Sequence, residues 1–428
     1  MPVVSTAVFA LVVIVFVAVS RRVGRAHLTA PIVFTLLGYL ASLLVDTTVD
    51  AALIRAIAEA TLAVVLFHDA AQVRPAQLRG DIGLCLRLLL VGLPLTILLG
   101  IGAANLLLPS LGFAFVLLLA SALAPTDAGL GAATVLNPVV PVRVRRILNV
   151  ESGLNDGLAT PVVLFAIALV SVPEGGNESA VVAALEELLI GTVAGIGLGA
   201  LAGALLARAI DHGWAERSLT PVAALAVPML TYYGAVSLSG NGFVAAFVSG
   251  TAFAWALERA RSSTSSAPDV EDSLLLAEWV SVALGYLVWA LFGFVAIASL
   301  TEFLTWQAVA FSLLSLTVLR MVPVAVALIG TGFRRPSVLF IGWFGPRGLA
   351  SVVFSVIAVE SLPMTDELRL VLATAVLTVL LSVVLHGITA GPWAAKYGAW
   401  AEREMPPAES AGSVEPTTGR SGVARTPR

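Results

Sequence analysis

The sequence has few charged residues and a single cysteine, and both scarcities narrow what the chain can be. Only 12% of its 428 residues are charged, while 58% are hydrophobic; soluble proteins carry about 25% charged residues. Cys85 alone excludes a disulfide framework within the chain, and we interpret it as a packing residue. The net charge of -3 gives no reason to expect a nucleic-acid partner. The sequence predicts an all-α integral membrane protein whose surroundings are the lipid bilayer.

Apolar runs long enough to cross a bilayer, about 20 residues each, recur along almost the whole chain. The first run lacks the basic segment that precedes the apolar core of a signal peptide, so we interpret it as a first span. Little sequence is left between the runs for a soluble domain. We predict thirteen spans, near residues 3–20, 29–45, 52–72, 82–107, 111–136, 152–172, 180–208, 219–238, 241–258, 273–298, 304–331, 337–359 and 367–390.

Arginines gather in the loops that follow odd-numbered spans. Because basic residues collect on the cytoplasmic side, this pattern predicts a multi-pass protein of the cytoplasmic membrane with its N-terminus outside and its C-terminus in the cytoplasm. The residues of this pattern are Arg21, Arg22, Arg25, Arg74, Arg79, Arg143, Arg145, Arg146, Arg208, Arg217, Arg259, Arg261, Arg334 and Arg335.

The spans divide into two halves of six on either side of a connector. We place the first half at residues 1–172, the connector span at 173–218 and the second half at 219–392. The remaining residues, 393–428, become rich in Pro, Ser, Glu, Thr and Arg, which cannot bury enough apolar surface to fold. We expect them to form a largely disordered cytoplasmic tail.

Two predicted spans contain residues that interrupt a regular membrane helix. Span five contains Ala124-Pro-Thr-Asp-Ala128 and span twelve contains Gly345-Pro-Arg-Gly348. Each proline frees backbone groups, which in lipid must be satisfied by protein or by a water-filled cavity. Both breaks fall in the fifth span of their half, and interrupted spans at matching positions point to the midplane site of an inverted-repeat transporter. Two unrelated proline kinks are the alternative, which the charge beside each break disfavours.

Span six opens with the motif Glu151-Ser-Gly-Leu-Asn-Asp156. Helical spacing puts Ser152 and Asp156 on one face, and Glu151 and Asn155 on the adjacent one. A hydroxyl beside a carboxylate offers hard oxygen ligands, which suit a small monovalent cation.

Counting the intramembrane charges suggests how such a site would work. The predicted spans contain three interior acids, Glu151, Asp127 and Asp156, and only two candidate bases to neutralise them, Arg320 and Arg347. Each charge at a span centre costs about 2.5–3.5 kcal/mol. Pairing therefore leaves one acid over, and burial moves such an acid toward exchanging its proton near neutrality. We assign Asp156 this role. One carboxylate that holds either a proton or a cation, combined with alternating access, gives antiport.

Two other classes of protein compete with a transporter. A passive cation channel could use the same oxygen ligands, but the excess of titratable acid over base disfavours it. An intramembrane aspartyl protease could use Asp127 and Asp156 as a dyad. Such a dyad needs neither paired helix breaks nor intramembrane arginines. We therefore expect a secondary transporter, with no enzymatic activity and no cofactor.

The two breaks, the span-six motif and the HGITAGP run that begins at His386 resemble the bacterial and archaeal sodium/proton antiporters of the first monovalent cation:proton antiporter family. The similarity extends over about residues 3–395. It implies a homodimer of thirteen-helix protomers, built as inverted repeats of six helices with two crossed discontinuous helices, spans five and twelve. It implies exchange of a cation for H+, with Na+ expected and Li+ or K+ as alternatives. The Asn-Asp form of the motif resembles the electroneutral one-for-one exchangers.

The resemblance also implies roles for individual residues. Asp156 is the carboxylate that binds the cation or the proton, with Ser152 and Thr126 as further cation ligands. Asp127 supports this site, and Asn155 is its neutral amide. The commoner form of the second break has leucine in the place of Pro346, which bears on the choice between Na+ and K+.

Further roles concern residues around this site. Glu151 and Arg320 match an internal ion pair, and Arg347 matches the charge beside the second break. Asp69 matches an acid on the cytoplasmic pathway. We interpret the neighbouring His68 as interfacial and His386 as a hydrogen-bonding residue between helices.

Overall fold

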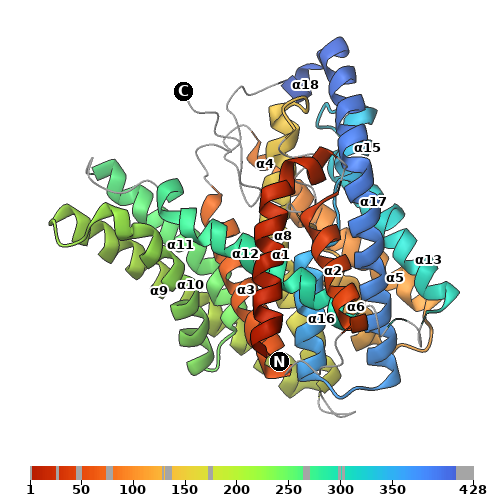
Figure 1. The fold of residues 1–428 in the computed structure, drawn as a ribbon, viewed down its shortest axis with the longest axis horizontal. Helices are drawn as coiled ribbons and strands as arrows, with labels where there is room; N and C mark the ends of the chain where they lie inside the picture. Colours follow the sequence, from red (N-terminus) through yellow and green to blue (C-terminus); the bar gives the residue numbers. More distant parts are fainter. Residues whose placement is uncertain are drawn as a thin grey trace.

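The computed structural model describes residues 2–25, 28–44, 51–73, 81–127, 130, 137–171, 177–263, 270–296, 300 and 304–410. These residues form helices, turns and short loops, and no β-strand occurs among them. Figure 1 shows their arrangement. The helices are α1 (Pro2–Arg25), α2 (Ala30–Leu44), α3 (Ala51–Gln72), α4 (Ile82–Arg87), η1 (Leu88–Gly92), α5 (Leu93–Leu107), α6 (Phe113–Ala122), α8 (Val142–Ser171), α9 (Asn177–Asp211), η2 (Arg217–Leu219), α10 (Thr220–Ser237), α11 (Gly242–Ser263), α12 (Val270–Ala296), α13 (Trp306–Leu316), α14 (Val318–Ala327), α15 (Arg335–Trp343), α16 (Leu349–Ser361), α17 (Asp366–Glu404) and α18 (Pro407–Ser410).

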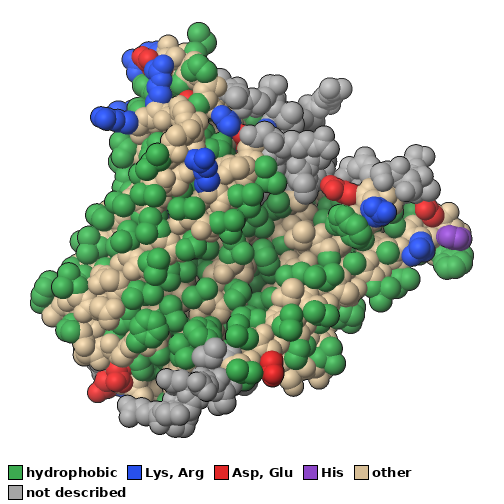
Figure 2. All heavy atoms as spheres, turned by 180° about the vertical axis from the view of Figure 1, so that it is seen from behind, with side chains coloured by type: hydrophobic (Ala, Val, Ile, Leu, Met, Phe, Trp, Pro, Cys, Tyr) green, Lys and Arg blue, Asp and Glu red, His purple; other side chains and the backbone are tan. Residues whose placement is uncertain are grey.

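The described helices are those of a multi-pass membrane protein. Seven candidate spans are long and apolar enough to cross a bilayer, and three shorter apolar helices accompany them. Figure 2 shows a broad band of hydrophobic side chains on one face, with Lys and Arg side chains gathered toward its upper end. The count of thirteen spans stays a prediction, because residues 131–136 of span five lie outside the described residues. Arg74 and Arg79 of the basic-loop pattern also lie outside them.

The helices form two groups that meet at α8. On one side, α9, α10 and α11 pack together and against α3 and α12, and α12 packs on α2. On the other side, α5, α6, α13, α14, α16 and α17 contact one another. Helix α8 contacts α6 on this second side and α3 and α9 on the first. A polar motif on α8 therefore lies between the two groups.

Helices α9 and α11 meet along a seam of four glycines spaced four residues apart. A Cβ on Gly191, Gly195, Gly199 or Gly203 would lie 2.4–2.7 Å from a backbone oxygen of α11 or of Asn241, the residue that precedes it. Only glycine leaves room for this approach. In lipid, close packing of small residues replaces the hydrophobic effect as the force between helices, so the seam joins the two helices along four turns.

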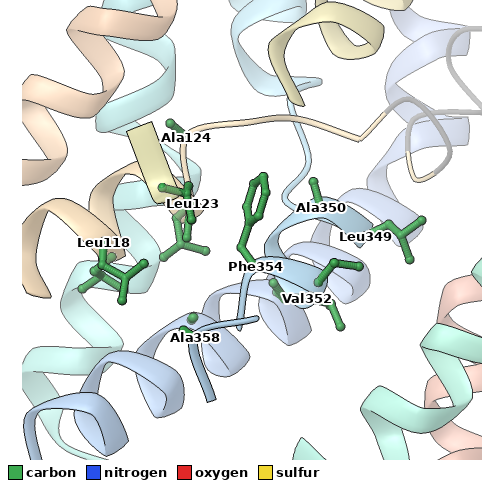
Figure 3. Packing of buried hydrophobic residues seen from close by; sticks show 14 of the residues in the cluster. Leu118, Leu123, Ala124, Leu349, Ala350, Val352, Phe354 and Ala358 are labelled. Atoms are coloured by element: carbon green, nitrogen blue, oxygen red, sulfur yellow. The ribbon is translucent and has the colours of Figure 1, made fainter. Parts of the chain in front are cut away.

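The interruption in the second half of the chain is plain. Helix α15 ends at Trp343 and α16 begins at Leu349. Figure 3 shows Phe354 projecting from α16 toward the end of α6, among Leu118, Leu123 and Ala350. Phe354 is fully buried in this cluster. Close packing between α16 and α6 thus places the two interrupted segments beside each other.

The end of the chain corrects the prediction that residues 393–428 are largely disordered. Helix α17 continues to Glu404 and α18 follows. Tyr397 stacks on Phe340 of α15 with a centroid distance of 4.1 Å, and its hydroxyl donates to Ser337 Oγ at 2.9 Å. Composition alone missed these contacts, because aromatic packing against α15 stabilises a segment whose average polarity suggested a tail. Residues 411–428 lie outside the described residues.

Candidate ion-binding site

Helix α8 presents four polar side chains to the protein interior. Glu151, Ser152, Asn155 and Asp156 are all buried, with at most 5% of each residue exposed. These four residues fall within two adjacent turns, and Arg145 and Thr160 are also buried on the same helix. Because polar groups in lipid are costly, this concentration must face partners within the protein.

Thr126 is the first of these partners. Its Oγ1 lies 2.9 Å from Ser152 Oγ, and it accepts a hydrogen bond from Asn155 Nδ2 at 2.7 Å. The amide thus points its donor at Thr126, while its Oδ1 has no hydrogen-bond partner within the described part of the chain. Thr126 thus links Ser152 and Asn155, the residue that precedes Asp156. Such neutral oxygens, beside one carboxylate, form a donor set suited to a small cation.

Asp127 makes two hydrogen bonds to the second helix break. Its Oδ2 accepts from the backbone N–H of Leu349 at 2.8 Å, and its own N–H donates to the Pro346 carbonyl at 2.8 Å. Leu349 is the first residue of α16. A carboxylate at a helix N-terminus is stabilised by the unpaired amides and the helix dipole. Asp127 therefore caps the second interrupted helix from the first.

Arg347 performs the reciprocal task. Its guanidinium, fully buried, donates to the carbonyls of Ala124 at 2.6 Å, Pro125 at 3.3 Å and Ser315 at 3.1 Å. The first two carbonyls belong to the non-helical segment that follows α6. Each of the two non-helical segments thus supplies a charged side chain that hydrogen-bonds to backbone groups of the other. This agrees with the expectation that freed backbone groups in lipid find partners within the protein.

Glu151 and Arg320 lie in direct contact. Both terminal guanidinium nitrogens reach the two carboxylate oxygens, at 2.5 and 2.8 Å. Arg320 lies on α14, just beyond a break at Thr317 that divides predicted span 304–331 into two helices. A Cβ on Gly345 would lie 2.3 Å from Arg320 Nε, so the second break packs on the guanidinium.

Asp69 borders the motif from α3. A Cβ placed on Gly153 would lie 3.4 Å from the Cβ of Asp69. His68 is buried rather than interfacial, and its Nδ1 lies 3.3 Å from Asp69 Oδ1. Gln72 also contacts the imidazole, with its Nε2 2.7 Å from His68 Nε2. Sequence reasoning missed Gln72, although its spacing of four residues from His68 on one helix was a usable signal.

Several other polar partners were also missed. Ser382 accepts from the Arg347 backbone N–H at 2.7 Å. At the other end of α8, Asp81 binds both Arg143 at 2.7 Å and Arg146 at 2.9 Å. No local pattern marks these residues, because their partners lie on distant helices.

The described helices form a multi-pass membrane fold in which the segment after α6 and the break between α15 and α16 satisfy each other's backbone groups. A family model described as "Sodium/hydrogen exchanger, transmembrane" matches residues 7–396, so the chain belongs to that family. This membership confirms the expected class, a transporter and not an enzyme. In three dimensions the chain is similar to the sodium proton antiporter MjNhaP1 from Methanocaldococcus jannaschii at pH 8, with a TM-score of 0.74 over 90% of this chain and 99% of that one. At 20% identity, this likeness shows a common fold.

Curated relatives are named for cation/proton exchange. The chain is 28% identical to the Na(+)/H(+) antiporter of Schizosaccharomyces pombe over 272 residues, 60% of this chain and 56% of that protein. It is 25% identical to the K(+)/H(+) antiporter NhaP of Alkalimonas amylolytica over 406 residues, 92% of this chain and 66% of that protein. The chain thus spans less than two thirds of the length of either relative.

Proposed function

We propose that the protein exchanges a monovalent cation for H+ across the cytoplasmic membrane by alternating access, with the two ions competing for Asp156. The observation that carries this proposal is the Thr126–Ser152–Asn155 cluster beside Asp156, at the contact of two interrupted segments. Family membership supports the activity, and the relatives' names leave both Na+ and K+ as candidate cations.

The distribution of charge supports a one-for-one exchange. Glu151 is neutralised by Arg320, and Asp127 is held at the N-terminus of α16. Asp156 is the acid that shares a helix face with Ser152 and its partner Thr126. Asn155 cannot titrate, so a single carboxylate carries one positive charge in either direction. In this scheme Ser152 and Thr126 coordinate the cation, and Asp69 lines its approach.

The larger architecture is part of the same proposal. Residues 1–172 and 219–392 form inverted repeats whose interrupted helices cross at the site, and the connector between them is residues 173–218. The proposed assembly is a homodimer of such protomers. The N-terminus lies outside and the C-terminus in the cytoplasm, which the gathering of Lys and Arg toward one end in Figure 2 supports.

The test is proton movement in proteoliposomes with an imposed pH gradient, adding Na+, Li+ and K+ in turn. We expect a cation to dissipate the gradient in wild type and not in Asp156→Asn. The amide has no negative charge, so it cannot exchange a bound proton for a bound cation. Glu186→Gln is the matched control, because this acid is exposed on α9 and should leave exchange intact. Exchange that survives in folded Asp156→Asn contradicts the assignment. Cation flux without proton movement points instead to a channel.

A further inference from the structure

The second helix break removes one particular backbone hydrogen bond. In a continuous helix the Trp343 carbonyl would accept from the Arg347 N–H four residues later. Here Arg347 N–H donates to Ser382 Oγ at 2.7 Å, while Trp343 O lies 3.0 Å from His386 Nε2 and also accepts from Gly345 N at 2.8 Å. Ser382 therefore accepts the Arg347 N–H in place of the Trp343 carbonyl. His386 in turn contacts the Trp343 carbonyl in place of the Arg347 N–H.

The two side chains form one unit on α17. They are four residues apart on one helix face, and both are almost fully buried. A carbonyl only accepts, so His386 Nε2 carries a proton and donates to Trp343 O. The other ring nitrogen, Nδ1, lies 3.3 Å from Ser382 Oγ and 3.0 Å from the Ser382 carbonyl. The Ser382 hydroxyl accepts the hydrogen bond from the Arg347 N–H, so the same serine contacts both the break and the imidazole.

The segment held in this way touches the ion-binding cluster directly. Between Trp343 and Arg347, the Pro346 carbonyl accepts from the Asp127 N–H at 2.8 Å. The residue before Asp127 is Thr126, whose hydroxyl contacts Ser152 and Asn155. A shift of the break would therefore move the Thr126 oxygen away from Asp156.

We propose that His386 and Ser382 are a positioning pair for ion exchange. They hold the second break open at the width that places Thr126 in the binding site. Neither side chain touches the ion in this scheme, and both act through the backbone of residues 343–347. The inference rests on the proposed exchange function and adds to it the residues that set the geometry of the site from α17.

The experiment measures the apparent KM for Na+ and for K+ and the maximal rate of exchange in proteoliposomes, per folded transporter. We expect His386→Ala and Ser382→Ala each to raise the apparent KM at least tenfold, because Thr126 is displaced. His386→Gln should stay within threefold of wild type, since its amide can still donate to the Trp343 carbonyl. The double alanine variant should be within twofold of His386→Ala, because the two residues act as one unit.

Thr389→Val is the matched control. Its hydroxyl accepts from the Trp343 indole N–H at 3.0 Å, so the variant removes a contact to the same tryptophan without changing the backbone of the break. We expect its apparent KM within twofold of wild type. The pair is merely structural if His386→Ala lowers folded yield but leaves the KM unchanged, and this result overturns the proposal. A glutamine variant as impaired as alanine overturns it as well.

Ser382→Ala keeps the proposal open to refutation if His386→Ala does not fold, because a wild-type KM in that variant contradicts the shared role. Exchange measured on the wild type distinguishes failure of the exchange function from failure of the positioning role. Wild-type protein that moves no protons in response to either cation refutes both the exchange function and the positioning role. Wild-type exchange with unaltered alanine variants refutes the positioning role alone.

Discussion

Arg320 holds Glu151 with both terminal nitrogens of its guanidinium, at 2.5 and 2.8 Å, between α14 and α8. The two side chains are 4% and 2% exposed, so neither charge is compensated by water. Because Ser152 follows Glu151 directly, this pair anchors the turn of α8 that carries Ser152 to the second half of the chain. Removing one partner of a buried pair strands the other, which typically costs 3–5 kcal/mol.

Arg320→Ala should therefore lower the free energy of unfolding by about 3–5 kcal/mol, visible as a lower melting temperature in detergent. Arg334→Ala is the matched control. Arg334 forms an ion pair with Glu404 in which both side chains are about half exposed, 48% and 51%, so its loss should cost about 0–1 kcal/mol. Replacing both buried partners, as in Glu151→Leu with Arg320→Met, should recover part of the loss. Equal melting temperatures for wild type and Arg320→Ala would contradict a formed pair.

Gly348→Ala should abolish exchange and lower stability. A Cβ there would lie 2.1 Å from Asp127 Oδ2 and 2.3 Å from its Cβ, so the carboxylate could not cap α16. Gly102→Ala is the control, because nothing lies within 4 Å of its Cβ position on α5. That change should be neutral or slightly stabilising, since alanine favours helix. Both variants would be compared by melting temperature and by exchange rate, and a fully active Gly348→Ala would show that Asp127 can move without consequence.

Asn155→Asp should make exchange respond to membrane potential. The substitution adds a second carboxylate beside Asp156, so the site can carry an additional positive charge. It also removes the Nδ2 donor to Thr126, which we expect to reduce the maximal rate. The measurement is exchange in proteoliposomes at a fixed pH gradient with an imposed potassium-diffusion potential. Rates that stay independent of potential would argue against the single-carboxylate account of stoichiometry.

Glu409→Ala should destabilise the N-terminal end of α15. Its buried carboxylate accepts from the Arg334 N–H at 3.0 Å and from Ser337 Oγ at 2.6 Å, at the N-terminus of that helix. Hydrogen bonds to a charged group contribute about 1.5–3 kcal/mol, which sets the expected loss of unfolding free energy. Glu402→Ala, an exposed acid on α17, is the control. Unchanged melting in Glu409→Ala would mean that the end of the chain does not support α15.

Local features of the sequence predicted much of the architecture and part of the site. Hydropathy located the apolar helices, because crossing lipid requires a run of fixed length. Proline next to a charge located both breaks, because freed backbone groups need partners. Counting charges left Arg320 and Arg347 as the candidate bases for the intramembrane acids. The family resemblance then paired Glu151 with Arg320, although 169 positions separate them.

The remaining features depend on how distant helices meet. No local pattern indicated that Asp127 caps α16, because that contact depends on the approach of Gly348. Nor did it indicate that Ser382 serves the Arg347 backbone, since serines are common in apolar helices. The order after residue 393 was missed because it rests on Tyr397 and Glu409 meeting α15.

The glycine seam between α9 and α11 has a consequence for how these helices find their alignment. Its period is four residues, so sliding one helix by about a turn brings three of the four glycines opposite equivalent backbone positions again. The seam alone therefore tolerates more than one register. At the end of the seam the Asn241 N–H donates to the Glu187 carbonyl at 2.8 Å. Close packing joins the helices, and this terminal hydrogen bond contributes to the stability of the observed register.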